Sequence, residues 1–174
     1  CDTVNLDNGQ DYRLMGLLQT HLYMAPHSPA IVLHVQNYLE EHVIPVQNQT
    51  DQLRVNGRDL RFKFCAEDTV WFNFEQLCKT NRSQNDFLEL ARLFNTLILT
   101  DIQVMDSHSD DVARRFVLLI DVLYDHHVIL IASAATTPEH LYQGKRLVFE
   151  FKRTASRLIE MQSQQYLGKL HTVQ

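Results

Sequence analysis

Two runs dominated by apolar residues, each of strand length, constrain the fold of this chain more than any other feature. They occupy residues 97–102 and 128–135. Between them lies a predicted helix over 109–126, whose first turn carries Asp110 and Asp111, where acidic side chains suit the helix dipole. Strands without polar alternation that are separated by a long helix are typical of a parallel sheet buried on both faces. The sequence therefore predicts an α/β fold with a parallel, P-loop-NTPase-like sheet in the second half.

The first half has a different pattern. Ser28 and Pro29 favour the start of a helix over 28–42, because serine caps helices and proline suits the first helical position. Asn56-Gly57 lies between alternating apolar residues at 53–64, which is the signal of a β-hairpin with a type I′ turn. Further expected elements are an extended piece at 3–6 with a turn at 7–9, a strand at 69–74, a helix at 83–95 and a terminal helix at 151–167. We interpret residues 1–174 as one domain, with a helix and hairpin part over 1–80 packed on an α/β part over 81–174.

Composition narrows the functional classes. The formal net charge of −5 and the absence of a Lys and Arg run argue against a nucleic-acid partner. No apolar run approaches the roughly 20 residues of a membrane span, so no membrane insertion is expected. Three cysteines without Cys-x-x-Cys spacing favour a reducing, cytoplasmic compartment, with Cys65 and Cys78 as buried thiols. The chain begins with Cys1 rather than Met, so it is expected to start inside a longer polypeptide.

The sequence does not match the residue spacing of common metal-binding, calcium-binding or phosphate-binding motifs. No two of the nine histidines lie three or four residues apart, so no metal site is predicted. The acidic loop over 106–111 has Asp and Val where a calcium loop needs Gly and Glu, and capping explains it better. Gly144-Lys145 has Glu139 in place of the first glycine and Arg146 in place of Ser or Thr, so it is not a phosphate loop. The chain is expected to contain no catalytic residue of its own.

Arginines are the remaining candidates for contact with phosphate or with another subunit. Arg153 and Arg157 lie one helical turn apart, a like-charge pair that Glu160 could partly relieve. Their residue types fit either a salt-bridged face or a site that meets anions from elsewhere.

Two further arginine positions leave the same choice open. Arg114 and Arg115 are adjacent in the helix over 109–126. We expect Asp111 to pair with Arg115, while Asp121 lies two turns along from Arg114, and either arginine could instead act as an arginine finger. Arg82, near Asp86 at a helix start, is the fifth candidate, with capping and local pairing as the default interpretation.

An ordered set of segments resembles the ZapE family of AFG-like P-loop ATPases over nearly the whole chain. Any one segment is weak, but the set and its spacing are specific. The matching segments are 4–13, 55–58, 74–78, 82–87, 113–125 and 151–163.

The resemblance implies a cytoplasmic, AAA-like ATPase that uses ATP and magnesium. Bacterial members associate with the division ring and destabilise polymers of the tubulin-like division protein. It further implies that the phosphate-loop lysine and Walker B acids lie upstream of this chain, which should therefore bind neither ATP nor magnesium alone. Its expected partners are the ATPase core of the same protein, division-ring components and, in a homo-oligomer, other copies of the protein.

Two functional readings remain open. In the first, this is a regulatory half of an ATPase whose arginines complete a nucleotide site. In the second, it is a non-catalytic interaction module that binds a client through the hairpin. The strand ending at Asp101, followed by Ile102 where a catalytic Glu would stand, also suggests a degenerate copy of the ATPase fold.

Overall fold

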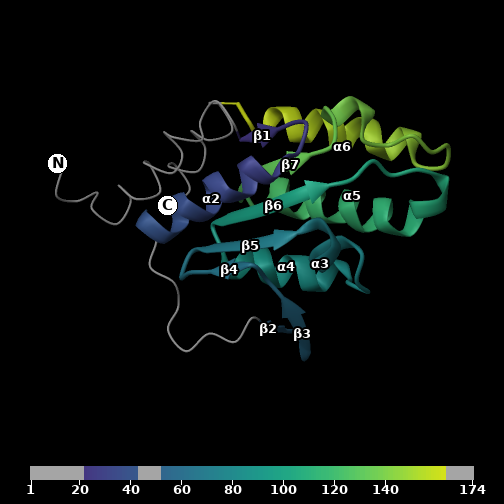
Figure 1. The fold of residues 1–174 in the computed structure, drawn as a ribbon. Coiled ribbons are helices and arrows are strands. Elements are labelled where there is room, and N and C mark those ends of the chain that lie inside the picture. The colour runs from purple at the N-terminus through teal and green to yellow at the C-terminus, as the bar shows by residue number, and fades with distance from the viewer. Residues whose placement is uncertain (1–21, 43–51, 164–174) are drawn as a thin grey trace.

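A computed structural model describes residues 22–42 and 52–163 of the chain. The predicted strand at 3–6, the turn at 7–9 and the last predicted helical residues, 164–167, lie outside the described residues. Figure 1 labels the elements along the chain.

The main sheet has five strands in the order β1-β7-β6-β5-β4. β5, β6, β7 and β1 run parallel to one another, and β4 pairs antiparallel at one edge. The strands are β1 (Tyr23–Met24), β4 (Phe64–Cys65), β5 (Thr69–Asn73), β6 (Thr96–Ile102) and β7 (Ile129–Ala134). Every residue of β7 is buried, as an interior parallel strand requires. This P-loop-NTPase-like α/β arrangement confirms the predicted fold class.

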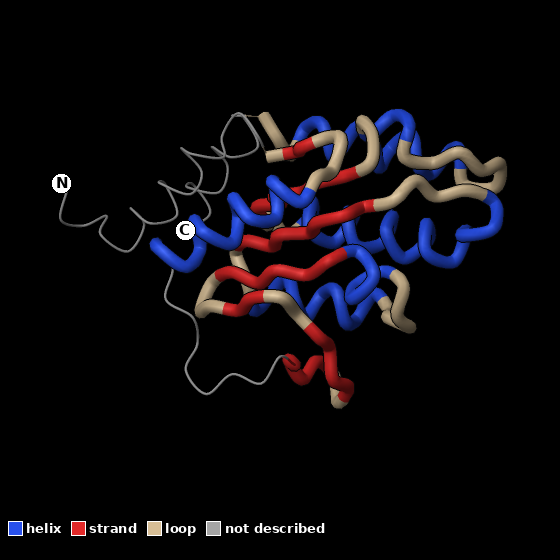
Figure 2. The backbone as a smooth tube through the Cα atoms, viewed as in Figure 1, coloured by secondary structure: helices blue, strands red, loops and turns tan. Residues whose placement is uncertain are grey.

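Helices cover both faces of the sheet. One face carries α2 (Pro29–His42), and α4 (Gln84–Leu93), α5 (Asp110–Asp125) and α6 (Val148–Glu160) lie on the other, as Figures 1 and 2 show. A short helix, α3 (Phe74–Cys78), follows β5, and two 3-10 turns, η2 (Ser107–Ser109) and η3 (Pro138–His140), precede α5 and α6. The buried residues of α5 recur at helical spacing along one side, which is the stripe that the sequence pattern predicted.

The predicted hairpin forms a separate two-stranded sheet from β2 (Gln52–Val55) and β3 (Arg58–Arg61). Asn56 and Gly57 both have positive φ angles, 51° and 81°, which is the conformation that a type I′ turn requires. Val55 and Leu60 are fully buried, so the hairpin packs against the body of the protein through one face.

Helix boundaries differ from the prediction mainly at the C-terminal end. α6 begins at Val148, three residues before the predicted start, because the Phe151 N–H donates to the Leu147 carbonyl. It ends at Glu160, where the Ser163 N–H donates back only three residues and closes a turn. The predicted continuation of this helix through residues 161–163 is therefore wrong. The short strands β1 and β4 were not predicted, because two residues carry no periodicity.

Candidate functional site

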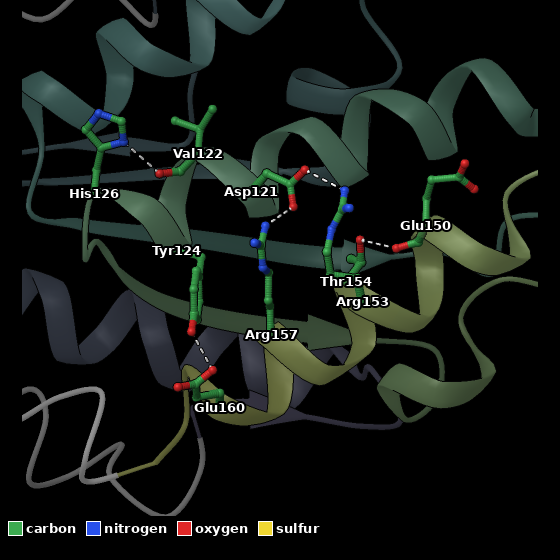
Figure 3. A network of polar contacts seen from close by, with 9 residues as sticks. All are labelled: Asp121, Val122, Tyr124, His126, Glu150, Arg153, Thr154, Arg157 and Glu160. Atoms are coloured by element: carbon green, nitrogen blue, oxygen red, sulfur yellow. Dashed lines mark hydrogen bonds and ion pairs between the residues drawn. The ribbon is translucent and has the colours of Figure 1, made fainter.

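One carboxylate holds the two arginines of α6. The Asp121 side chain, on α5, accepts a hydrogen bond from Arg153 Nη2 at 3.1 Å and a second from Arg157 Nη1 (Figure 3). The Asp121 and Arg157 side chains are only 20% and 25% exposed, whereas Arg153 is 52% exposed. The like-charge pair predicted from the sequence is thus neutralised across the α5–α6 seam by a residue of the other helix.

The network continues from Arg157 toward the end of both helices. The Arg157 guanidinium lies 4.8 Å from the centroid of the Tyr124 ring, a cation–π contact. The Tyr124 hydroxyl donates to Glu160 Oε2 at 2.6 Å, and this hydrogen bond is the main cause that raises the pKa of Tyr124. From its spacing Glu160 could relieve part of the repulsion between the two arginines. In the structure Asp121 accepts from both, and Glu160 accepts from Tyr124.

Arg115 is tied to the body of the fold. Its Nε donates to the backbone carbonyl of Cys78 at 2.7 Å, at the end of α3. Among the described residues no ion pair joins Arg115 to Asp111, so the expected pairing across one turn is wrong. The side chain turns toward α3 because the Cys78 carbonyl, at the last residue of a helix, lacks a partner within that helix. Burial also raises the pKa of the Cys78 thiol.

Arg82 joins the hairpin to the start of α4. Its Nη2 donates to the Asp59 carbonyl at 2.9 Å and its Nε to Thr80 Oγ1 at 3.2 Å. The neighbouring Asp86, only 2% exposed, accepts from the Ser83 N–H and from the Asn56 side chain, each at 3.1 Å. Asp86 therefore caps the start of α4, as the default interpretation had it. Arg82 does not pair with Asp86; its bond to the Asp59 carbonyl is instead a tertiary contact with the hairpin.

Arg114 differs from the other four arginines. Within the described residues, its side chain is exposed and has no hydrogen-bond or ion-pair partner. It lies two helical turns before Asp121 on α5, toward the end of the helix where the carboxyl ends of the parallel strands emerge. Arg114 is therefore the candidate that can reach a group outside this structure without first breaking a contact.

Sequence reasoning missed an aromatic anchor at the start of α5 and α6. The Tyr142 hydroxyl donates to Asp110 Oδ1 at 2.7 Å and accepts from the Leu147 N–H at 3.1 Å. Its ring stacks on Phe151 at 5.3 Å. A Cβ atom added at Gly144 would lie 2.3 Å from the Tyr142 hydroxyl oxygen, so the glycine of Gly144-Lys145 makes room for this ring. The signal available in the sequence was a glycine two residues after a tyrosine.

A second missed group lies at the carboxyl end of the sheet. His27, in the loop after β1, meets Ser133 at the end of β7, with 2.7 Å between Nδ1 and Oγ. Asp101 at the end of β6 faces the same imidazole, with 4.0 Å between its Oδ1 and Nε2. We call these three residues the strand-end cluster. Only the position of Asp101, late in an apolar strand, marked it in the sequence.

The described residues can also be searched for metal and membrane features. Within residues 22–42 and 52–163, no group of three or more His, Cys, Asp or Glu side chains is placed to hold a metal ion. No helix in the same ranges is long and apolar enough to cross a membrane.

Comparison with known proteins places the whole chain. A family model described as AFG1-like ATPase matches residues 1–170. The cell division protein ZapE of Escherichia coli K12 is 39% identical over 171 residues, which cover 98% of this chain and 46% of that protein. Lactation elevated protein 1 homolog B of Danio rerio is 28% identical over 201 residues, and an uncharacterized protein of Schizosaccharomyces pombe is 28% identical over 194.

The match to the zebrafish protein covers 95% of this chain and 40% of that protein. The match to the fission yeast protein covers 93% of this chain and 42% of that protein. The chain therefore spans less than half the length of the curated relatives it matches. No solved structure matches it. Since the family model covers nearly every residue and the bacterial relative is well above 30% identical, the chain belongs to the AFG1-like ATPase family.

Proposed function

We propose that this chain forms the non-catalytic half of a cell-division ATPase and that Arg114 completes a nucleotide site formed elsewhere in the protein. The observation that carries the proposal is that Arg114 is exposed and unengaged in the described residues, whereas Arg82, Arg115, Arg153 and Arg157 all bond within the fold. An arginine finger must be free to approach a phosphate, because it stabilises charge that develops during transfer of the phosphoryl group.

The full-length protein would supply the phosphate loop, with ATP and magnesium bound there. The expected setting is the cytoplasm with recruitment to the division site, in keeping with the cell division name of the bacterial relative. The expected client is the polymer of the tubulin-like division protein, which the full-length protein would destabilise in an ATP-dependent way. An exposed arginine on a rigid helix suits contact within one subunit or across the boundary of a homo-oligomer.

The test is steady-state ATP turnover by the full-length protein with Arg114→Ala. We expect kcat to fall by at least about 100-fold with little change in KM, because such an arginine acts mainly on the transition state. Arg61→Ala is the matched control, since Arg61 is another exposed arginine without a described partner, and it should leave turnover unchanged. Normal turnover by a folded Arg114→Ala protein would eliminate the proposal.

Mixing experiments distinguish the two placements of Arg114. A variant that lacks the phosphate-loop lysine still carries Arg114, and the Arg114→Ala variant still carries an intact phosphate loop. If the arginine acts across a subunit boundary, mixing the two inactive proteins restores part of the activity. If it acts within one subunit, the mixture stays inactive.

A second candidate function is an interaction module centred on the hairpin. A pocket of about 620 Å³ lies beside the hairpin turn, lined by Asn56 and Arg58 from the hairpin and by residues of α4, with His126 after α5. Arg58 also donates to the Asn81 carbonyl at 3.1 Å, which fixes the hairpin against the start of α4.

Co-sedimentation with the division polymer tests the module. Arg58→Ala and Arg92→Ala should weaken co-sedimentation while ATP turnover stays normal, because both side chains line the pocket and neither is a proposed nucleotide contact. Wild-type co-sedimentation by both variants would argue against the hairpin as the client site.

A further inference from the structure

The strand-end cluster lies where open parallel sheets bind ligands. β1 continues into α2 on one face of the sheet, whereas its neighbour β7 leads toward α6 on the opposite face (Figures 1 and 2). Adjacent strands whose connections leave in opposite directions create a crevice at their carboxyl ends, and ligands of such folds bind there. In this protein, His27, Asp101 and Ser133 meet at that point.

Hydrogen bonds connect all three residues of the cluster. Ser133, fully buried, accepts at its Oγ from the Asp101 N–H at 3.1 Å. The Asp101 carboxylate faces Nε2 of His27, which favours the tautomer with its proton on that nitrogen. Nδ1 is then the acceptor for the Ser133 hydroxyl, at 2.7 Å. The imidazole thus joins the loop after β1 to the ends of both β7 and β6.

Backbone geometry supports a specialised position for Asp101. Its φ angle is +62°, in the left-handed region that few non-glycine residues adopt. The pairing of β6 with β7 shifts register between Leu99 and Ile102, so the unusual conformation coincides with a local break in the ladder. Such conformations persist where surrounding contacts hold them, and the bond from the Asp101 N–H to Ser133 is one such contact.

The same positions hold nucleotide in an ATPase of the P-loop class. There a strand runs through a glycine-rich loop into a helix, the loop wraps the phosphates, and an acid from a nearby strand binds the magnesium ion. In this protein β1 runs through residues 25–28 into α2, yet this loop contains neither glycine nor lysine. Its polar side chain that contacts the strand ends is His27.

We infer that the carboxyl edge between β1 and β7 is a nucleotide-type site with a built-in occupant, the His27 imidazole, which closes the crevice and fixes the β1–α2 loop in one conformation. The inference rests on the ATPase family of the chain and on the cluster contacts. It is independent of Arg114, and its readouts differ from turnover, so either proposal can fail alone.

Hydrogen exchange on the 174-residue chain tests the closure. We expect His27→Ala to speed exchange of the amide hydrogens of residues 27, 28 and 30–32 by about tenfold or more, because the loop loses its side-chain contact to the strand ends. Ser133→Ala should also speed exchange there. The double variant should exchange no faster than His27→Ala alone, because the bond between the loop and Ser133 is already absent once His27 is removed. His34→Ala, an exposed histidine on α2, is the matched control, and the α6 amides report whether each variant is folded.

Binding tests the occupant. The wild-type chain should show no saturable binding of magnesium pyrophosphate up to about 1 mM. Enzymes typically bind their substrates at or below this concentration. Binding that appears only in His27→Gly would support the inference. Binding by the wild-type chain that His27→Ala abolishes would overturn it, because His27 would then be a ligand of an open site. Wild-type exchange rates in both His27→Ala and Ser133→Ala would overturn it as well.

Discussion

Replacing Asp121 by alanine tests whether the α5–α6 seam depends on one shared carboxylate. The change removes the acceptor of both arginine hydrogen bonds and leaves Arg153 and Arg157 as an uncompensated like-charge pair. The bond to half-exposed Arg153 lies in the surface range of about 0.2–1 kcal/mol. The bond to Arg157 is better shielded, and after discounting for its exposure we assign it about 1–2 kcal/mol.

The expected total loss for Asp121→Ala is therefore about 1–3 kcal/mol in the free energy of unfolding, or roughly 2–12 °C in Tm for a chain of this size. In urea unfolding, the loss in the free energy of unfolding should increase in the order Arg153→Ala, Arg157→Ala, Asp121→Ala. Arg157→Ala exceeds Arg153→Ala because Arg157 is less exposed and also contacts the Tyr124 ring.

Asp125→Ala is the control for this experiment. Asp125 is an exposed acid at the last position of α5, and its removal should change stability by no more than about 0.5 kcal/mol. An Asp121→Ala protein as stable as the Asp125→Ala protein would refute the reasoning, as would a larger loss for Arg153→Ala than for Arg157→Ala.

Two predictions concern the Tyr142 anchor. Gly144→Ala should lower the free energy of unfolding by about 1–3 kcal/mol, because the new Cβ displaces the Tyr142 ring from its two hydrogen bonds and its stacking partner. In a Tyr142→Ala background the same change should cost under about 0.5 kcal/mol, and equal costs in both backgrounds would contradict the steric account. Burial is the main cause that raises the pKa of Tyr142, and the hydrogen bond to Asp110 adds to it. The protonated side chain therefore stabilises the fold fully below the ordinary tyrosine pKa of about 10. This contribution is lost as the pH rises above that value. Urea unfolding at about pH 8 and about pH 11 should thus show a Tyr142→Phe deficit that shrinks at the higher pH, and a deficit that grows would reverse the assigned sign.

Elements with a strong local pattern were predictable from the sequence. β6, β7 and α5 follow from apolar runs and one helical stripe, and the hairpin turn follows from Asn56-Gly57, because only a few residue types accept positive φ at both turn positions. The order of the strands was not predictable in the same way. β1 has two residues, and its place beside β7 depends on contacts that are distant in the sequence.

The arginines show the same limit for the candidate site. The residue types and spacing on α6 marked Arg153 and Arg157, but their partner Asp121 lies on another helix, so its role depends on how α5 packs against α6. Local spacing proposed Glu160 and Asp111 as partners, and tertiary contacts override both. The strand-end cluster joins three separate segments, and no local pattern brings them together.

The pairing of β1 with β7 also has a consequence for how the chain folds and aggregates. β5, β6 and β7 each pair with the neighbouring parallel strand in the sequence, whereas β1 joins residues as far apart as Tyr23 and Ala132. Contacts of such long sequence separation form late, so β1 is expected to dock after the other parallel strands and to leave before them. Until β1 docks, β7 is an unpaired edge strand of six apolar or small residues. Its free backbone N–H and C=O groups can then pair with a strand of another molecule, which leads to aggregation. A strand of two residues thus protects the folded protein against association through its own core.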